Sequence, residues 1–506
     1  MPPRVGLDDI AVHIPALYLP METFAELRNQ DFGKLSKGLG LLGMSVPDVH
    51  QDPATMAAMA VAELIDRNRL DPRAIGRLYL GTESALDGAK PTATYILQML
   101  TMRYAPTHGA DCFSRCDVVD LTFACIGAVD ALHNTLDWVA QDPERIGVVA
   151  FADNAKYERG SPGEYTQGAG GGAMLVTHSP RLLSISPSVG VSTRPVHDFF
   201  KPRRELSTRT LLQDVLQAAK AEGAQLPPEL LDRLLARLKA QEHPLVQDDV
   251  LSLHKDTPLF DGPLSNRCYR EAVKLAFGHF REQAIASGRF DPERDPVLTE
   301  QWARIVLHLP YAFQGKRMFP DLYHHDRQDL PEYAALNAEL GPAPQPEAFE
   351  QVQEYERASE DYRRRLSKTS AYRQFVNQRI ERGQRASSLV GNQYTGSLFL
   401  ALMSTLECDF HEGNEMVGER IGLCAYGSGA KSKVFEGTVE AGWRDIVARF
   451  KLFEGLEKRQ ALDGVQYEAL HRRAQLSSIR SPRQEFVLER VGSGADEGQR
   501  FYGWAP

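Results

Sequence analysis

The first third of the chain alternates between the hydrophobic patterns of strands and those of helices. Apolar residues recur at helical spacing in two stretches, 54–68 and 127–141. Short, mostly apolar runs of the kind found in buried strands occur at 4–15, 75–84, 145–155, 171–178 and 181–192. Strands that alternate with helices predict a parallel-rich sheet covered by helices on both faces.

The same order of patterns returns later in the chain. The run "ARIVLHLP" predicts a buried strand that ends at the polar His308, and "GNQYTGSLFLALMSTLE" places small and polar residues ahead of an apolar helix. The segment "ERIGLCAYGSGAKSKVFEGTV" then predicts a strand, a glycine-rich turn and a second strand. We therefore predict an α/β fold of two duplicated halves, residues 1–178 and 179–506.

Two segments depart from this pattern, at about 203–256 and 320–388. Both are rich in charged residues and contain amphipathic helical stretches such as "LPPELLDRLLARLKAQ". We expect surface helical insertions with solvated faces; a lid, a partner-binding surface and an oligomer contact are the alternatives. The polar tail after Pro482 is expected to be loosely held.

Composition and charge exclude several classes of protein. The chain is 42% hydrophobic and 25% charged, as in soluble globular proteins, and its net charge of −9 argues against binding of nucleic acid or an anionic membrane surface. No apolar run approaches the ~18 residues of a transmembrane helix, and the N-terminus lacks a basic-then-apolar leader pattern. Six scattered cysteines form neither a disulfide framework nor a zinc site, so we expect a cytoplasmic protein without a metal.

Three residues at the ends of predicted strands could carry chemistry: Glu83, Cys125 and His308. Reactive groups in open α/β sheets gather at the carboxyl ends of the strands. Cys125 stands among small residues directly ahead of a predicted helix, where the helix dipole lowers the pKa of a thiol from its usual ~8.5. The alternatives are a space-filling core thiol, a solvated strand-end carboxylate and a satisfied core histidine. The glycine-rich "CAYGSGAKSK" lacks the spacing of an ATP-binding P-loop.

Taken together and in order, a set of motifs resembles the hydroxymethylglutaryl-CoA (HMG-CoA) synthases, a branch of the thiolase-fold condensing enzymes. The motifs are "GTESALD", "FACIGA", "FADNAKYERG", "EYTQGAGGGAML", "HDFFKP", "PLFDGPLSNRCY", "LHLPYAFQGKRM", "GNQYTGSLFLAL" and "AYGSGAKS". The resemblance implies a thiolase-like fold with layered αβαβα halves. It also implies an acyltransferase that makes HMG-CoA from acetyl-CoA, acetoacetyl-CoA and water in the mevalonate route of isoprenoid biosynthesis, as a homodimer with no cofactor.

The resemblance also implies a role for each of the three candidates. Cys125 attacks acetyl-CoA and becomes acetylated, which divides one difficult condensation into easier steps. Glu83 removes a proton from the acetyl methyl group, and a carboxylate in a dry pocket suffices because a thioester acidifies its α-hydrogens. His308 donates a hydrogen bond to the acceptor carbonyl, and water finally cleaves the thioester.

Further residues are implied to contact the substrates by the same likeness. Asn392 and Ser428 would line the acyl pocket, and the backbone N–H groups of Cys125 and Ser428 would stabilise an oxyanion. The residues expected to bind the substrates are Ala124, Tyr157, Lys316, Asn392 and Ser428. Asp153 and Asp198 occupy matching positions, but the sequence indicates no role for them.

The chain departs from the family pattern at two positions near these motifs. Phe313 stands where many members carry a lysine five residues after the histidine, with Lys316 and Arg317 following, and Ile126 replaces a frequent aromatic residue. These departures do not identify the acceptor, the ketoacyl substrate that the acetyl group joins. One alternative is an enzyme that adds β-branches to polyketides bound to an acyl carrier protein; another is an inert protein that binds CoA esters or scaffolds partners.

Overall fold

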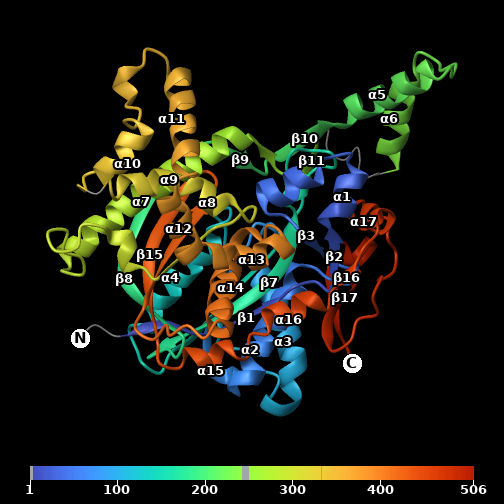
Figure 1. Cartoon of the computed structure of the whole chain (residues 1–506). Helices are drawn as coiled ribbons and strands as arrows, with labels where there is room; N and C mark the ends of the chain where they lie inside the picture. Colours follow the sequence, from blue (N-terminus) through green and yellow to red (C-terminus); the bar gives the residue numbers. More distant parts are fainter. Residues whose placement is uncertain (1–3, 242–249, 332) are drawn as a thin grey trace. The chain divides into compact units, whose positions relative to one another are not determined.

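The computed structural model describes residues 4–241, 250–331 and 333–506, and the chain divides into two compact units (Figure 1). The larger unit consists of Met1–Asp198 and Asp261–Pro506, and the smaller of Phe199–Phe260. The first predicted half, residues 1–178, lies within the larger unit, whereas the second, residues 179–506, also contains the smaller unit. The predicted boundary after residue 178 falls between the strands β7 and β8 of the larger unit.

A nine-stranded sheet forms the centre of the larger unit, in the order β13-β14-β15-β8-β1-β7-β6-β4-β5. The pairs β4–β5, β4–β6 and β13–β14 are parallel, whereas the others are antiparallel. The prediction of a parallel-rich sheet was wrong, because short connections such as the turn between β14 and β15 return the chain antiparallel. The strands are β1 (Val5–His13), β4 (Ile75–Gly81), β5 (Asp117–Leu121), β6 (Ile146–Ala155), β7 (Gly168–His178), β8 (Leu183–Thr193), β13 (Arg304–Leu307), β14 (Arg420–Gly427) and β15 (Lys431–Val439).

The two ends of this sheet repeat one arrangement. The order β1-β7-β6-β4, with two antiparallel pairs and one parallel pair, recurs as β8-β15-β14-β13. The helices recur as well: α2 (Pro53–Asn68) and α7 (Gly262–Ala286) follow β1 and β8, while α4 (Gly127–Val139) and α14 (Ser397–His411) precede β6 and β14. This repetition agrees with the two similar series of patterns in the sequence.

The repeats join where β1 meets β8, at Gly6 and Leu7. A Cβ atom on Gly6 would lie 2.1 Å from the Leu183 carbonyl oxygen, so the close approach of these strands requires glycine.

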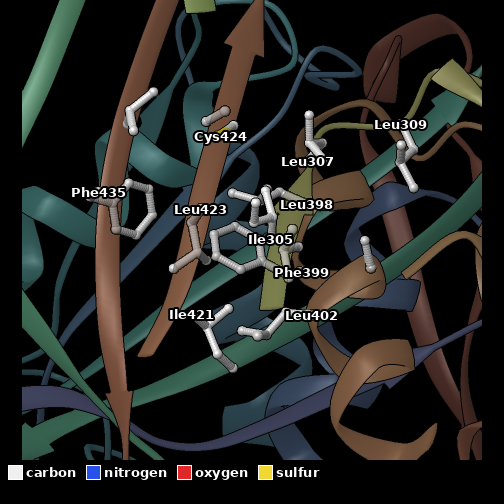
Figure 2. Close-up of a cluster of buried hydrophobic side chains, with 14 of the residues drawn as sticks. Ile305, Leu307, Leu309, Leu398, Phe399, Leu402, Ile421, Leu423, Cys424 and Phe435 are labelled. Carbon is white, nitrogen blue, oxygen red and sulfur yellow. The ribbon is translucent and has the colours of Figure 1, made fainter. Parts of the chain in front are cut away.

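Alternate residues of β6 point into two different cores. Val148 belongs to a cluster formed with α2 and α3 (Thr92–His108), and Val149 to the cluster that includes α4 and α14. On the other repeat, Figure 2 shows side chains of β13 and β14 packed against Phe399 and its neighbours on α14. Helix α7 packs on β8 and β15. Helices α2 and α3 therefore share one core with the first repeat of the sheet, while α4, α7 and α14 share the other core.

The remaining elements surround these layers. A small sheet consists of β2 (Leu17–Pro20), β3 (Gly43–Val46) and β16 (Gln460–Ala461). The other helices are α1 (Met21–Leu27), α8 (Gln314–Met318), α9 (Pro320–His325), α10 (Tyr333–Leu340), α11 (Val352–Leu366), α12 (Ser370–Arg379), α13 (Glu381–Val390), α15 (Trp443–Val447), α16 (Leu452–Glu457) and α17 (Gly464–His471). In the described part of the chain, no helix combines the length and the apolar character needed to cross a membrane.

The smaller unit contains the first predicted insertion, 203–256, of which residues 242–249 lie outside the described chain. Its helices are α5 (Thr208–Ala221) and α6 (Leu230–Ala240), as the amphipathic pattern predicted. Two antiparallel strand pairs frame them: β10 (Arg203–Ser207) with β11 (Val250–His254), and β9 (Phe199–Phe200) with β12 (Leu259–Phe260). These strands have only two or five residues each, which is too short to give a clear periodic hydrophobic pattern.

The second predicted insertion, 320–388, contains α9 to α12 and most of α13. Helices α12 and α13 have exposed positions, as expected, and each also has a buried face. Tyr372 and Phe375 of α12 and Ala386 of α13 are buried in the main core. The apolar residues of α12 recur at helical spacing between arginines and glutamines, so a high content of polar residues concealed a buried face.

The polar C-terminal tail is ordered, contrary to expectation. It forms an antiparallel hairpin of β17 (Glu485–Val491) and β18 (Arg500–Ala505). Phe486 is 1% exposed in the cluster of α2 and α3, and the Tyr502 hydroxyl donates to Asp52 Oδ2 at 2.7 Å. One apolar face of the hairpin suffices to hold it in place.

Replacement of Phe486 tests this attachment. We expect Phe486→Ala to lower the free energy of unfolding by roughly 3–5 kcal/mol, because it leaves a cavity in a fully buried position. The control Val491→Ala, in the same hairpin but 50% exposed, should change it by less than about 0.5 kcal/mol. Equilibrium chemical denaturation measures both, and equal stability of the two variants would contradict the packing.

Candidate active site

Cys125 lies in the turn between β5 and α4. Ala124 directly before it has φ +41°, in the left-handed region that residues with side chains seldom adopt, and Ile126 after it is the N-cap of α4. The turn therefore presents Cys125 at the positive end of the helix dipole. Cys125 is half-buried, whereas Cys112, Cys408 and Cys424 are buried.

Two glycines let the neighbouring strand ends approach this turn. A Cβ atom on Gly427, the last residue of β14, would lie 2.6 Å from the Phe123 carbonyl oxygen. A Cβ atom on Gly81, the last residue of β4, would lie 2.2 Å from the Ala128 nitrogen. Only glycine fits these positions, and the residues that follow, among them Ser428 and Glu83, are thereby brought to the Cys125 turn.

Glu83 is in direct contact with Cys125. The Cys125 thiol donates to Glu83 Oε1 at an Sγ–Oε1 distance of 3.0 Å. The backbone of Glu83 is fixed in turn, because its N–H donates to Asp153 Oδ1 at 2.7 Å. The other oxygen of this fully buried carboxylate accepts the Thr395 N–H at 3.0 Å. Asp153 therefore links β4 of the first repeat to the segment ahead of α14 in the second.

Two buried tyrosines adjoin the Cys125–Glu83 pair. Burial raises the pKa of the Tyr157 phenol, and the negative charges of Cys125 and Glu83 raise it further. Burial likewise raises the pKa of Tyr394, with Tyr157, Glu83 and Cys125 as further causes. Both phenols are therefore neutral hydrogen-bonding groups. The Tyr394 N–H donates to Asn392 Oδ1 at 2.8 Å, so Asn392 is part of the same cluster.

His308 follows the last residue of β13 and is 2% exposed. The backbone N–H of His308 donates to the Cys424 carbonyl oxygen at 3.1 Å. The backbone carbonyl oxygen of His308 accepts a hydrogen bond from the Tyr269 hydroxyl at 2.6 Å. Burial lowers the pKa of His308 to about 3, so the imidazole is neutral at physiological pH. The Tyr269 ring lies 6.1 Å from the His308 ring, and Cys125 is among the groups that raise the pKa of Tyr269. Tyr269 thus adjoins His308, and the charge of Cys125 acts on its phenol.

The turn that carries Ser428 is held by a second buried carboxylate. Asp198 accepts the Tyr426 hydroxyl on Oδ2 and the Gly429 N–H on Oδ1, each at 2.8 Å. Tyr426 stacks on Tyr269, with ring centroids 4.6 Å apart. This arrangement gives Asp198 a structural role that its position in the sequence did not indicate.

Lys316 is not brought into this cluster. Its ammonium lies 3.2 Å from the centroid of the Phe313 ring, and burial lowers the pKa of Lys316. Phe313 packs on Gly40, where a Cβ atom would lie 2.5 Å from the ring. In the described part of the chain, no recorded hydrogen bond or ion pair joins Lys316 to Cys125 or Glu83.

Of the residues predicted from the sequence, the structure therefore gathers Cys125, Glu83, Tyr157 and Asn392 into one cluster. The turn geometry adds Ala124 and Ser428, and His308 lies against Tyr269. Sequence reasoning missed the parts played by Asp153, Tyr269, Tyr426 and Thr395, because their partners are far away along the chain. Two cavities of about 450 and 770 Å³ lie elsewhere, around Glu300 and Gln301.

The chemical groups of the site are protein side chains and backbone groups. All six cysteines are free thiols. Within residues 4–241, 250–331 and 333–506, no group of three or more histidine, cysteine, aspartate or glutamate side chains is placed to hold a metal ion. A nucleophile, a carboxylate and a neutral imidazole supply what acyl transfer and proton abstraction need.

Comparisons with known proteins agree on one family. Its N-terminal sequence model, hydroxymethylglutaryl-coenzyme A synthase N terminal, matches residues 1–180, and the C-terminal model matches residues 251–485. A hydroxymethylglutaryl-CoA synthase of Haloferax volcanii is 29% identical over 493 residues, 96% of each chain. The solved structure of MvaS in complex with 3-hydroxy-3-methylglutaryl coenzyme A has a TM-score of 0.75 at 27% identity, with 100% of both chains covered. These likenesses confirm the predicted thiolase-like fold.

A fourth match concerns the fold alone. The HMG synthase of the curacin biosynthetic pathway, solved in complex with holo donor-ACP, has a TM-score of 0.70 at 18% identity. It covers 99% of this chain and 100% of its own.

The low pKa of His308 predicts a measurable sensitivity to acid. Between pH 6.5 and about 3, the unfolded chain protonates this histidine and the folded protein does not, so stability is complete above pH 6.5 and falls as the pH decreases. From pH 7.5 to pH 5, the free energy of unfolding should fall by about 2 kcal/mol more in the wild type than in His308→Asn. Chemical denaturation at the two pH values measures this, and an identical loss in both proteins would contradict a neutral buried imidazole.

Proposed function

The chain belongs to the hydroxymethylglutaryl-CoA synthase family, and we propose that it condenses acetyl-CoA with acetoacetyl-CoA through an acetyl-Cys125 intermediate. It is an acyltransferase of the condensing type. The observation that carries the proposed mechanism is the 3.0 Å contact between Cys125 Sγ and Glu83 Oε1. This contact places a carboxylate beside any two-carbon group attached to the sulfur.

The first proposed step is acylation. The Cys125 sulfur attacks the acetyl carbonyl carbon, the carbon–sulfur bond of acetyl-CoA breaks, and CoA leaves with a proton as its thiol. Backbone N–H groups of Cys125 and Ser428 stabilise the oxyanion, and removal of one such donor typically costs ~3–4 kcal/mol of transition-state stabilisation. Ala124 and the N-terminus of α4 shape this turn.

The second proposed step is carbon–carbon bond formation. Glu83 takes a proton from the methyl group of the acetyl thioester, and the resulting enolate carbon attacks the ketone carbon of the acceptor. His308, neutral because it is buried, donates a hydrogen bond to the ketone oxygen as negative charge develops there. Tyr157 and Asn392 form walls of the acyl pocket. The resulting alkoxide takes up the proton that Glu83 removed, and water then cleaves the Cys125 thioester and releases HMG-CoA.

The proposed setting is the mevalonate pathway of the cytoplasm, without a metal or an organic cofactor. Six free thiols are the state that a reducing cytoplasm maintains. We propose a homodimer, because β5 ends the described sheet and exposes 37% of Val119 along an edge suited to pairing with a second copy. Lys316 is the proposed contact for a CoA phosphate, since none of the described carboxylates forms an ion pair with it.

Mass spectrometry after incubation with acetyl-CoA tests the covalent step. The wild type should gain one acetyl group, and Cys125→Ala should gain none, because the nucleophile is absent. Glu83→Ala should still acylate but should lose HMG-CoA formation by a factor of ~10³ or more, since it lacks the base. Loss of acylation in Glu83→Ala would overturn this division of labour, and an unmodified wild type would favour a protein that only binds CoA esters.

The acceptor is tested by competition between two ketoacyl thioesters. With free acetoacetyl-CoA we expect turnover at least ~10-fold faster than with the same group on an acyl carrier protein, because the two most similar relatives above are named for CoA esters. Product formation under identical conditions is the measurement, and Cys125→Ala is the blank for both acceptors. Faster turnover on the carrier protein would favour the β-branching reaction.

A further inference from the structure

The loop 156–167 carries Tyr157 to the Cys125–Glu83 pair, and Tyr157 is held there by its backbone. The Tyr157 N–H donates to Gln167 Oε1 at 2.8 Å. The Tyr157 carbonyl oxygen lies 3.0 Å from His471 Nε2, which serves as its donor. Both main-chain groups of Tyr157 are therefore engaged, one by the far end of its own loop and one by α17, some three hundred residues later in the chain.

Helix α17 also holds Gln167. The Gln167 side-chain N–H donates to the Tyr467 hydroxyl at 2.7 Å, and this hydroxyl donates to Glu164 Oε1 at 2.8 Å. His471 Nε2 lies 3.2 Å from Gln167 Oε1, so one N–H is shared between two acceptors. Tyr467 and His471 are four residues apart and thus project from one face of α17.

Ion pairs connect this loop to α17 and to Arg28. Arg28 donates from Nε and Nη2 to the two oxygens of Glu164, at 2.8 and 2.6 Å. It also donates to Glu468 on α17 at 2.6 Å. Burial alone would raise the pKa of Glu164, but the hydrogen bonds from Arg28 and its other donors keep it lowered. The loop is therefore held by ion pairs that Arg28 forms with Glu164 and Glu468.

The same loop end positions the second wall of the cluster. The Thr166 carbonyl oxygen accepts the Asn392 N–H at 3.0 Å. Next to it, a Cβ atom on Gly391 would lie 1.9 Å from the Gln167 carbonyl oxygen. The contacts that hold Gln167 therefore also hold the segment 391–394, which carries Asn392 and Tyr394.

We propose that α17 acts as a clamp on the loop 156–167, with His471 and Gln167 as positioning residues that set Tyr157 and Asn392 against the Cys125–Glu83 pair. This inference rests on the proposed function, since it assigns these residues to the placement of the acyl pocket. Neither residue touches a reacting atom. Their loss would leave the thiol and the carboxylate intact but would allow the pocket walls to drift, and a displacement of about 1 Å can cost ~10²-fold in rate.

Three variants of α17 test the clamp. His471→Ala removes the donor, His471→Gln restores a side-chain N–H at nearly the same reach, and Val465→Ala, on an 80% exposed position of the same helix, is the control. We expect His471→Ala to lower kcat ~10- to 100-fold with KM changed less than ~3-fold. His471→Gln should recover activity to within ~3-fold of the wild type, and Val465→Ala should equal it.

Amide hydrogen exchange supplies a readout that does not depend on activity. In His471→Ala, exchange should accelerate within residues 156–167 and 391–394, while α2 and α7 remain as protected as in the wild type. If the wild type forms no acetyl-enzyme, the proposed function fails, and the exchange pattern alone still decides for or against the clamp. If the wild type is acetylated and His471→Ala matches it in kcat and exchange, the clamp is wrong. Failure of His471→Gln to recover, or a general rise in exchange, would equally overturn it.

Discussion

The Asp153 carboxylate is fully buried between the two repeats, and the hydrogen bonds it accepts determine whether the rest of the site can form. A carboxylate in this environment is tolerated only when donors surround it. Here the donors are the N–H of Glu83, the hydroxyl of Thr82, and the N–H and hydroxyl of Thr395. Because two come from the residues that follow β4 and two from the segment ahead of α14, the two repeats must be correctly placed before this charge is satisfied. The same bonds that satisfy it place the Glu83 side chain against the Cys125 sulfur.

A second consequence of burial concerns the charge of the imidazole. His308 sits among strand ends and aromatic rings, and with its pKa near 3 it carries no positive charge at the pH of a cell. A neutral imidazole adds no positive charge at these strand ends, where the proposed mechanism requires a hydrogen-bond donor. The Tyr269 hydroxyl donates to the His308 carbonyl oxygen, and the centroids of the two rings lie 6.1 Å apart.

Local pattern predicted the central helices and strands, because burial of one helix face or of a whole strand leaves a period in the sequence. It failed for features that depend on partners far away. The directions of β7 and β15 follow from their connections, and the C-terminal hairpin is ordered by one buried face against α2 and α3. Motif order indicated Cys125, Glu83 and His308 as candidates. The roles of Asp153 and His471 arise from contacts with residues more than two hundred positions away in the sequence. The spacing of residues along the chain does not predict such contacts.

Phe313 shows how one departure from the family pattern is accommodated. Its ring occupies the space above Gly40, which has φ +76° and no side chain to obstruct it, and the two positions depend on each other. A lysine at 313 would leave that space without an apolar filling, whereas the ring offers its face to the Lys316 ammonium one helical turn later. Arg317 is engaged with the Gly38 carbonyl oxygen, so it is less available for a phosphate. We therefore propose that Lys316, three residues further along, supplies the positive charge that the family pattern places at position 313. The ammonium of Lys316 packs on the ring of Phe313, which stands in place of the family lysine.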